Sequence, residues 1–184
     1  MASAFSHAIV AVTLGTAWKA DRLPLRFWFL GAACSAAPDL DALGYWIGIP
    51  YEHMLGHRGI THSFVFAALL SCVVVAVAFK ESDRPVSRVS LLTYFFLVTA
   101  LHGVLDAMTD GGLGVAFFSP FDNTRYFFPF RPLVVPPLEP ESFFTTSGIR
   151  VLMSELKWVW FPCTFVFAVL CARRCLQAGR NPVR

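Results

Sequence analysis

The chain has 184 residues, of which 56% are hydrophobic and only 15% are charged, and its mean hydropathy is +0.59. Soluble domains usually contain about one quarter charged residues, so this composition excludes a disordered chain or an ordinary soluble domain and indicates a membrane protein. The net charge of +3, from 15 Lys and Arg against 12 Asp and Glu, is too small and too scattered to indicate nucleic-acid binding.

Two short apolar stretches come first, at residues 4–18 and 25–38. As helices of 15 and 14 residues they would be about 22 Å long, which is less than the ~30 Å of a bilayer core. We therefore expect a short helical hairpin that ends at Pro38.

Three longer apolar stretches follow. Residues 63–79 and 89–108 are each long enough to span a membrane as a helix. The last stretch, roughly 156–172, begins with a Lys and two Trp residues that suit a membrane interface and ends in a basic tail at 173–184. Pro162 is expected to kink this helix near its start.

Most cations lie in the segments that connect or follow these stretches. Residues 19–26, 80–88 and 173–184 contain ten of the 15, namely Lys19, Arg22, Arg26, Lys80, Arg84, Arg88, Arg173, Arg174, Arg180 and Arg184. The positive-inside rule makes these segments cytoplasmic. Five crossings then place residues 39–62 and 109–150 on the outer side.

The sequence thus predicts an all-α, polytopic membrane bundle of about five transmembrane or half-membrane helices, forming one domain over residues 1–184. We expect residues 1–112 to build the functional site. Residues 113–150 would form an aromatic and Pro-rich outer loop, 151–172 the final transmembrane helix, and 173–184 a cytoplasmic tail.

In this topology the potential metal ligands all reach the outer face of the membrane. They are His7, Asp39, Asp41, His57, His62, His102 and Asp106. Imidazole and carboxylate ligands without thiolates suit zinc, manganese or iron. Because this set exceeds the four ligands of a tetrahedral zinc site, we expect two or three ions, with zinc preferred.

The carboxylate-containing clusters also have structural interpretations. His102 and Asp106, four residues apart on one helix face, could grip a cation or share a hydrogen bond that settles helix packing. Asp39 and Asp41 repel each other unless a cation lies between them; alternatively they belong to a solvated loop in which Asp41 caps the next helix.

The remaining candidates leave similar alternatives open. His57 and His62 could be interface histidines, and His7 could be a packing residue. Arg58 could neutralise a phosphate or anchor the chain to lipid headgroups.

Three weaker candidates lie beside these motifs. Asp110 is an additional ligand or, as we prefer, part of a turn. Glu52 and His53 could contribute a general base but are expected to face solvent. Residues 117–130 are strongly aromatic, which favours an interfacial belt over a lid or entry groove for acyl chains.

The order of the motifs resembles a known family. His7, PDLD at 38–41, HRGITHS at 57–63 and HGVLDAMTDGG at 102–112 are similar to the YdjM-like family of predicted membrane-bound metal-dependent hydrolases, DUF457. The resemblance covers roughly residues 1–130. It implies a bacterial or archaeal inner-membrane protein with hydrolase activity, and it makes the seven residues above the metal-ligand candidates.

The HxxxD element of His102 and Asp106 is also similar, more distantly, to that of zinc-dependent phospholipases C and related nucleases, whose sites hold three zinc ions. This chain keeps Met1 where those enzymes use a processed N-terminal Trp. We assign catalytic roles to Arg58, Asp106 and His62.

The sequence therefore predicts a hydrolase that cleaves a phosphoester bond of a membrane lipid or lipid-linked substrate with metal-activated water at the outer face. Amide or ester hydrolysis, a non-catalytic scaffold stapled by metal, and metal transport are the alternatives. A transporter would need polar groups that reach the opposite face, which residues 66–79 and 160–172 do not offer.

Overall fold

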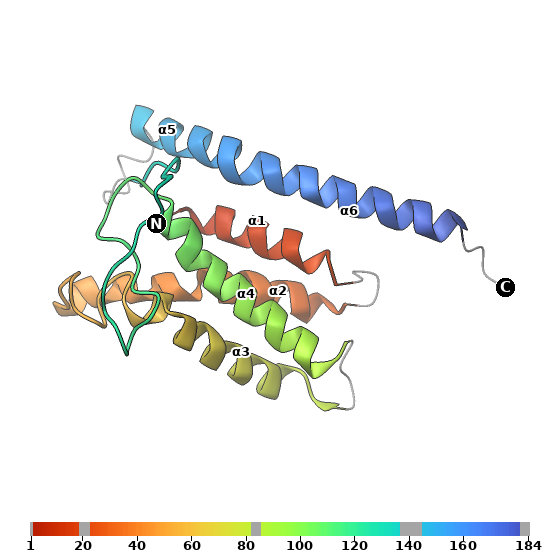
Figure 1. The fold of residues 1–184 in the computed structure, drawn as a ribbon, viewed down its shortest axis with the longest axis horizontal. Helices are drawn as coiled ribbons and strands as arrows, with labels where there is room; N and C mark the ends of the chain where they lie inside the picture. The colour runs from red at the N-terminus through yellow and green to blue at the C-terminus, as the bar shows by residue number, and fades with distance from the viewer. Residues whose placement is uncertain (1, 19–22, 82–85, 137–144, 181–184) are drawn as a thin grey trace.

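Helices make up all the regular secondary structure of the computed structural model, which describes residues 2–18, 23–81, 86–136 and 145–180 (Figure 1). In chain order they are α1 (Ala4–Gly15), α2 (Leu25–Ala36), η2 (Ala37–Ile47), η3 (Ile60–His62), α3 (Phe64–Ala78), α4 (Arg88–Ala107), α5 (Thr146–Glu155), η6 (Leu156–Trp160) and α6 (Phe161–Arg180). Only two isolated β-bridges accompany them in the described ranges, so the all-α prediction is confirmed. The predicted features at Met1, Lys19, Arg22, Arg84, Arg184 and residues 137–144 lie outside those ranges.

Serine side chains begin three of these helices. Ser3, Ser63 and Ser87 cap α1, α3 and α4, and each accepts a hydrogen bond from the backbone N–H three residues later. A serine at this position satisfies one of the N–H groups that the first helical turn leaves without a partner. The first and second of these caps also fix the start of the helices next to His7 and His62.

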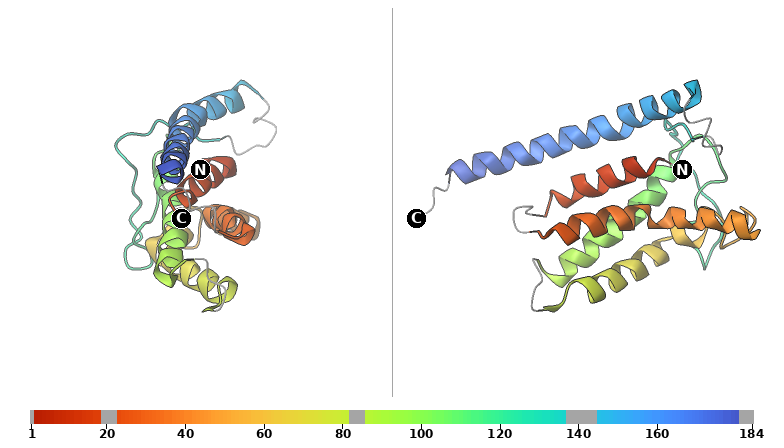
Figure 2. Two further views of the ribbon diagram at one scale, coloured as in Figure 1. Left: turned by 90° about the vertical axis from the view of Figure 1, so that its right-hand side faces the viewer. Right: turned by 180° about the vertical axis from the view of Figure 1, so that it is seen from behind.

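Helix α4 packs against α1, α2 and α3 and forms the centre of the bundle (Figures 1 and 2). Tyr94 of α4 stacks on Phe27 of α2 with 4.1 Å between ring centroids, and its hydroxyl donates to the Ala11 carbonyl of α1 at 3.1 Å. A Cβ atom at Gly31 would lie 2.1 Å from the Tyr94 hydroxyl oxygen, so the glycine permits this close approach. The Tyr94 side chain of α4 therefore contacts both α1 and α2.

Helix α2 does not end at Pro38, as the sequence predicted, but continues as the 3₁₀ helix η2. Pro38 lies in the first turn of η2, where its missing N–H needs no partner. The helix stops at Gly48, whose φ of 79° is left-handed. Asp39 and Asp41 consequently lie on a helix and not in a loop.

The C-terminal helix is longer than predicted. Helices α5, η6 and α6 follow one another without interruption from Thr146 to Arg180, whereas the sequence predicted a helix over roughly 156–172. A π-helical turn, η6, lies just before Pro162, where the sequence predicted a kink. A proline lacks the N–H for the helical bond and its ring crowds the carbonyl four residues earlier, which explains the wider turn at this point.

Within the described ranges, two helices are long and apolar enough to cross a membrane, over Arg88–Ala107 and Thr146–Gln177. Helix α3 has 15 residues, which is about 22 Å, so it is shorter than the ~30 Å expected of a full span. Helices α1 and α2 have 12 residues each, in agreement with the predicted short hairpin.

The helices alternate in direction, and the connections gather at two ends of the bundle (Figures 1 and 2). The start of α1, η2, η3 and the start of α5 lie at one end. The ends of α1, α3 and α6 and the starts of α2 and α4 lie at the other. All the predicted ligand motifs are therefore at one end of the molecule, and the described cations Arg26 and Arg88, in the first turns of α2 and α4, and Arg173 and Arg174, in the second half of α6, lie toward the opposite end.

Candidate metal centre

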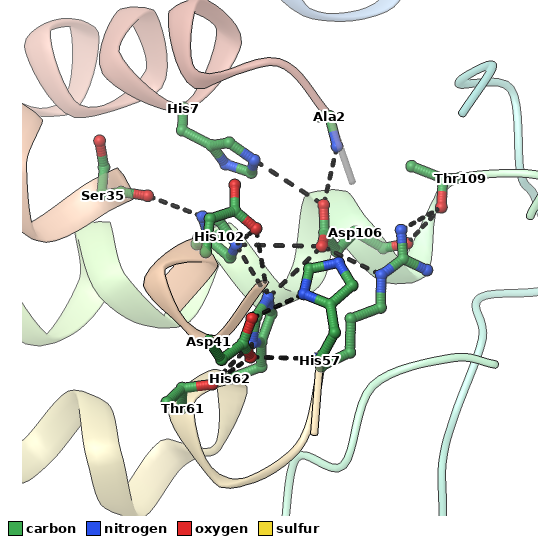
Figure 3. Close-up of polar contacts among 12 residues, drawn as sticks. Ala2, His7, Ser35, Asp41, His57, Thr61, His62, His102, Asp106 and Thr109 are labelled. Atoms are coloured by element: carbon green, nitrogen blue, oxygen red, sulfur yellow. Dashed lines mark hydrogen bonds and ion pairs between the residues drawn. The ribbon is translucent and has the colours of Figure 1, made fainter. Parts of the chain in front are cut away.

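Four side chains from three elements converge at this end of the bundle (Figure 3). Asp39 comes from η2, His62 from η3, and His102 and Asp106 from successive turns of α4. One ligand atom from each lies within 4.8 Å of those of the other three. The closest approaches are 3.0 Å between the Nε2 atoms of His62 and His102 and 3.3 Å between His102 Nε2 and Asp39 Oδ1.

The 3₁₀ form of η2 explains how both of its aspartates reach histidines. Residues two apart in a 3₁₀ helix project about 120° from each other, whereas in an α-helix they project to nearly opposite sides. Asp39 thus approaches His62 and His102, while Asp41 approaches His57 and the far side of the His62 ring.

Hydrogen bonds at the back of the two central histidines fix their tautomers. His102 Nδ1–H donates to the Ser35 carbonyl at 2.7 Å, because a carbonyl can only accept. Thr61 Oγ1 donates its own hydrogen to Asp41 Oδ2, so it accepts from His62 Nδ1 at 3.1 Å, and Asp41 Oδ2 lies 3.1 Å from the same nitrogen. Both Nε2 atoms then carry lone pairs that face each other at 3.0 Å, an arrangement that needs a cation or a proton between them.

Buried polar atoms without a hydrogen-bond partner in the described structure concentrate at the same point. They are both oxygens of Asp39, Oδ2 of Asp106, both ring nitrogens of His7 and Nε of Arg58. Burying a carboxylate is costly unless it is paired or coordinates an ion. The oxygens of Asp39, which have no hydrogen bond, therefore fit a cation bound beside the two Nε2 atoms, with Asp106 Oδ2, whose ion pair is with Arg58 Nε, on its other side.

The carboxylates stabilise positive charge at His62. Burial lowers the pKa of His62, but contacts with Asp106, Asp39 and Asp41 outweigh it and raise that pKa from 6.5 to about 10. Burial raises the pKa of Asp39 and Asp41, but hydrogen bonds with the neighbouring histidines hold both well below the usual range. A divalent ion would take the place of the proton that these acidic groups favour.

A second group, Asp41, His57 and His62, adjoins the first and shares His62 with it. Asp41 Oδ1 accepts from His57 Nδ1 at 2.6 Å, and Oδ2 accepts from the backbone N–H of Arg58 at 3.1 Å and from the Thr61 hydroxyl. Its oxygens are already used by hydrogen bonds. This arrangement suits a carboxylate that orients histidines from behind.

Arg58 is buried, with 1% of its surface exposed, and its φ of 63° is left-handed. Its Nε lies 3.2 Å from Asp106 Oδ2, and its two terminal nitrogens donate to Thr109 Oγ1 at 3.0 Å and the Gly111 carbonyl at 2.9 Å. The burial is at odds with the alternative of a headgroup anchor. The guanidinium instead neutralises Asp106 from the side and holds the turn that follows α4.

The model of the YdjM inner membrane protein family matches residues 1–179. The chain belongs to this family. It is also similar to Inner membrane protein YbcI of Escherichia coli (strain K12), at 33% identity over 177 residues, which cover 95% of this chain and 99% of that protein. No solved structure matches it. The expected family and bacterial inner-membrane location are therefore confirmed, and neither name states an enzymatic activity.

In this family member, His7 lies at the edge of the cluster. Its ring stacks on that of His102 with centroids 3.8 Å apart, and its Nε2 is 3.7 Å from Asp106 Oδ1. It is not among the four side chains that approach one another within 4.8 Å. All seven predicted ligands are thus brought into one connected region, but only Asp39, His62, His102 and Asp106 converge on one point.

The weaker candidates lie away from that point. Asp110 Oδ1 accepts from the Val135 backbone N–H at 2.8 Å, in agreement with a role in the turn. Glu52 and His53 are exposed, as expected of solvent-facing residues. The aromatic segment 117–130 braces the His57 loop through Arg125, which donates to the His57 carbonyl at 2.9 Å.

Sequence reasoning missed the buried Glu155 of α5. Its carboxylate accepts from the Ser3 backbone N–H at 2.6 Å, from the Ser3 hydroxyl, and from the Ser6 hydroxyl at 2.9 Å. The adjacent Ala2 N–H donates to Asp106 Oδ1 at 2.8 Å. A single acidic residue just before the apolar stretch of the last helix was the available signal.

Proposed function

We propose that this chain is a multi-pass, membrane-bound, metal-dependent hydrolase that cleaves a phosphoester bond of a lipid or lipid-linked substrate. The observation that carries the proposal is the convergence of two tautomer-fixed Nε2 atoms with oxygens of Asp39 and Asp106. A divalent ion held there would act as a Lewis acid on phosphoryl oxygens and lower the pKa of a bound water.

Zinc is the ion that best fits two imidazoles and two carboxylates, with manganese and iron as alternatives. The point at which Asp39, His62, His102 and Asp106 converge would hold a single ion. Further ions, expected from the sequence, would have to use His7 beside Asp106, or Asp41 and His57 with His62 as a bridge. The second arrangement would require Asp41 to give up hydrogen bonds that it now accepts.

The substrate would reach the centre between Asp39 and His57. Their side chains are 12% and 8% exposed, whereas those of His62, His102 and Asp106 are fully buried. Because His57 Nδ1–H donates to Asp41, its Nε2 is free to accept a proton. Asp41 and Arg58 then act as positioning residues, the first for two histidines and the second for Asp106.

The proposed substrate class is based on the position of the candidate metal centre in the bundle. The centre lies at the end of the bundle opposite the described cations Arg26, Arg88, Arg173 and Arg174, and the positive-inside rule would turn these cations to the cytoplasm. The centre would then lie at the periplasmic face, where an amphiphile can place its polar group at the metal and its chains in the bilayer.

The test is metal analysis of the purified protein followed by turnover of phospholipids and lipid-linked phosphates with and without a chelator. We expect bound zinc, chelator-sensitive release of product, and loss of both in Asp106→Asn. His53→Gln is the matched control because His53 is exposed and outside the cluster. A protein that binds no divalent ion, or a metal-free variant with full activity, would contradict the proposal.

A metal-stapled scaffold is the second candidate, because three of the four convergent side chains are fully buried and join η3 to α4. In that case chelation would unfold the protein and no substrate would be turned over. Thermal unfolding measured beside turnover, with and without chelator, separates the two functions.

A further inference from the structure

An apolar groove runs between α2–η2 and α3. It has a volume of about 350 Å³. Its walls include Ala33, Ala36 and Ala37 of α2 and η2, Leu40 of η2, and Leu70 and Val74 of α3. The small side chains of the three alanines leave the groove hollow, while the leucines and the valine form its sides.

The apolar line continues past the groove along η2. A 3₁₀ helix repeats every three residues, so Ala37, Leu40 and Leu43 lie on one side of η2. Leu40 is 66% exposed and Leu43 is 52% exposed. From Leu30 to Leu43 the line is about 22 Å long, counted with the α-helical rise up to Ala37 and the 3₁₀ rise beyond it.

This line passes beside the candidate metal centre. Asp39 projects about 120° around η2 from the Ala37–Leu40 side, so it flanks the groove. Its side chain is also the most exposed of the four convergent ligands, at 12%. A chain lying in the groove, which along α2 and η2 runs from Leu30 to Leu40, would therefore have its polar end next to Asp39 if that end lies at Leu40.

Another apolar groove, of about 390 Å³, lies between α1 and α6 and includes Phe5, Ile9 and Val12. On α1, His7 projects about 140° to 160° away from these residues, because successive residues of an α-helix are rotated by about 100°. Helix α1 itself thus separates that groove from the metal centre. Of these two grooves, the α2–α3 groove is the one that flanks a ligand.

We propose that the α2–α3 groove binds one acyl chain of the lipid substrate, with the phosphoester at the Asp39 end. This inference rests on the hydrolase function proposed above. An acyl chain matches the apolar side chains that line the groove and the membership of this chain in an inner-membrane protein family. The groove would then select substrates by their acyl chain and hold the phosphoester at a fixed depth in the membrane.

The first experiment measures binding without turnover. A long-chain phosphatidylglycerol with a photoactivatable diazirine in one acyl chain is crosslinked to the full-length protein in bilayers. We expect the crosslinks to concentrate on peptides that contain Ala33, Leu40 and Leu70. An even distribution over all lipid-facing helices, or crosslinks concentrated on α6, would overturn the proposal.

The second experiment narrows the groove. Ala33 is exposed in the groove wall, so Ala33→Phe fills it without entering the helix core. The matched control is Ala68→Phe, which adds the same ring to an exposed alanine of α3 outside that wall. We expect Ala33→Phe alone to lower kcat/KM for a long-chain substrate about tenfold or more, with metal content and turnover of a short-chain analogue unchanged.

The two proposals fail in different ways. Equal activity of Ala33→Phe and Ala68→Phe on the long-chain substrate would overturn the acyl site while the hydrolase function stands. Crosslinks centred on the groove in a protein that turns over no phosphoester would overturn the hydrolase function and leave lipid binding in place.

Discussion

The Nε2 atoms of His62 and His102 lie 3.0 Å apart, and each ring is held from behind through its Nδ1 atom. The Ser35 carbonyl accepts from the ring of His102, and the Thr61 hydroxyl, which itself donates to Asp41, accepts from the ring of His62. Two neutral rings held this way present two lone pairs to each other, which is unfavourable in a buried site. The pair therefore fits a cation or a proton between the rings, and the flanking oxygens of Asp39 and Asp106 supply the negative counter-charge.

Replacement of His102 by Gln should remove the bound ion. The amide is close in size to imidazole but does not provide an equivalent nitrogen ligand at the point facing His62, so zinc content should fall to near background. Element analysis of the purified variant measures this. His53→Gln should keep the wild-type content, and a His102→Gln protein that still holds a full complement of zinc would contradict the assignment.

Asp41→Asn should weaken metal binding without abolishing it. The side chain keeps its shape, but its amide nitrogen can no longer accept from the histidines and backbone that Asp41 now holds. Loss of such a supporting carboxylate typically costs about 10- to 100-fold in metal affinity. Competition with a chromophoric chelator measures the affinity.

The same titration tests the number of ions. We expect wild-type protein to saturate its tightest class of site at one zinc per chain, with Asp39→Asn losing that class altogether. If Asp41→Asn loses an ion that Asp39→Asn retains, Asp41 is a ligand of a separate site and not a support for His62.

Zinc binding should release a proton between about pH 7 and pH 9. The pKa of His62 is raised to about 10 in the metal-free protein, so the ring is protonated in this range and must lose its proton to bind the ion. The affinity should therefore rise with pH. Calorimetry in buffers of different ionisation enthalpy counts the protons released, and a pH-independent affinity would contradict the geometry.

The same raised pKa predicts the pH dependence of stability. For a group whose pKa is 6.5 when unfolded and about 10 when folded, the stabilisation is fully present below pH 6.5 and is lost as pH rises toward 10. Metal-free protein should thus lose stability over that window, and saturating zinc should reduce the loss.

Much of the centre could be predicted from the sequence because its ligands are spaced by local geometry. His102 and Asp106 are one helical turn apart, and their shared face follows from the helix alone. The hydropathy pattern also placed all the motifs at one end of the bundle, which the alternating helix directions confirm.

The rest depended on features that local patterns do not encode. Nothing in the sequence distinguished a 3₁₀ continuation after Pro38 from a loop, yet this continuation decides which way Asp39 and Asp41 project. The burial of Arg58 depends on a left-handed φ and on Thr109, which is far away in the chain. These are tertiary contacts, so they were visible only in the folded chain.

Arg58→Met should destabilise the protein strongly. The methionine can occupy part of the arginine volume, but Asp106 loses its ion pair at 3.2 Å and the turn at Thr109 loses a donor. Removing one partner of a buried ion pair typically costs about 3–5 kcal/mol. Thermal unfolding in detergent measures the loss. Arg150→Met at an exposed position of α5 is the control, and equal unfolding temperatures for the two variants would contradict the buried role.

Glu155→Gln should loosen the start of the chain and, through it, the metal centre. Glu155 accepts from the Ser3 N–H and from the hydroxyls of Ser3 and Ser6, whereas a glutamine offers one oxygen and an NH₂ group that cannot accept. The lost bonds should cost about 1–3 kcal/mol. Because the Ala2 N–H next to this contact donates to Asp106, hydrogen exchange at residues 2–6 should quicken and zinc affinity should fall.

The control for that change is Glu52→Gln, an exposed residue at the same end of the molecule. It should leave hydrogen exchange and zinc affinity unchanged. If Glu155→Gln quickens exchange in α5 and α6 but leaves zinc affinity at the wild-type value, Glu155 only docks the C-terminal helix. If both change together, the contact from Glu155 through Ser3 and Ala2 to Asp106 couples the long C-terminal helix to the metal centre.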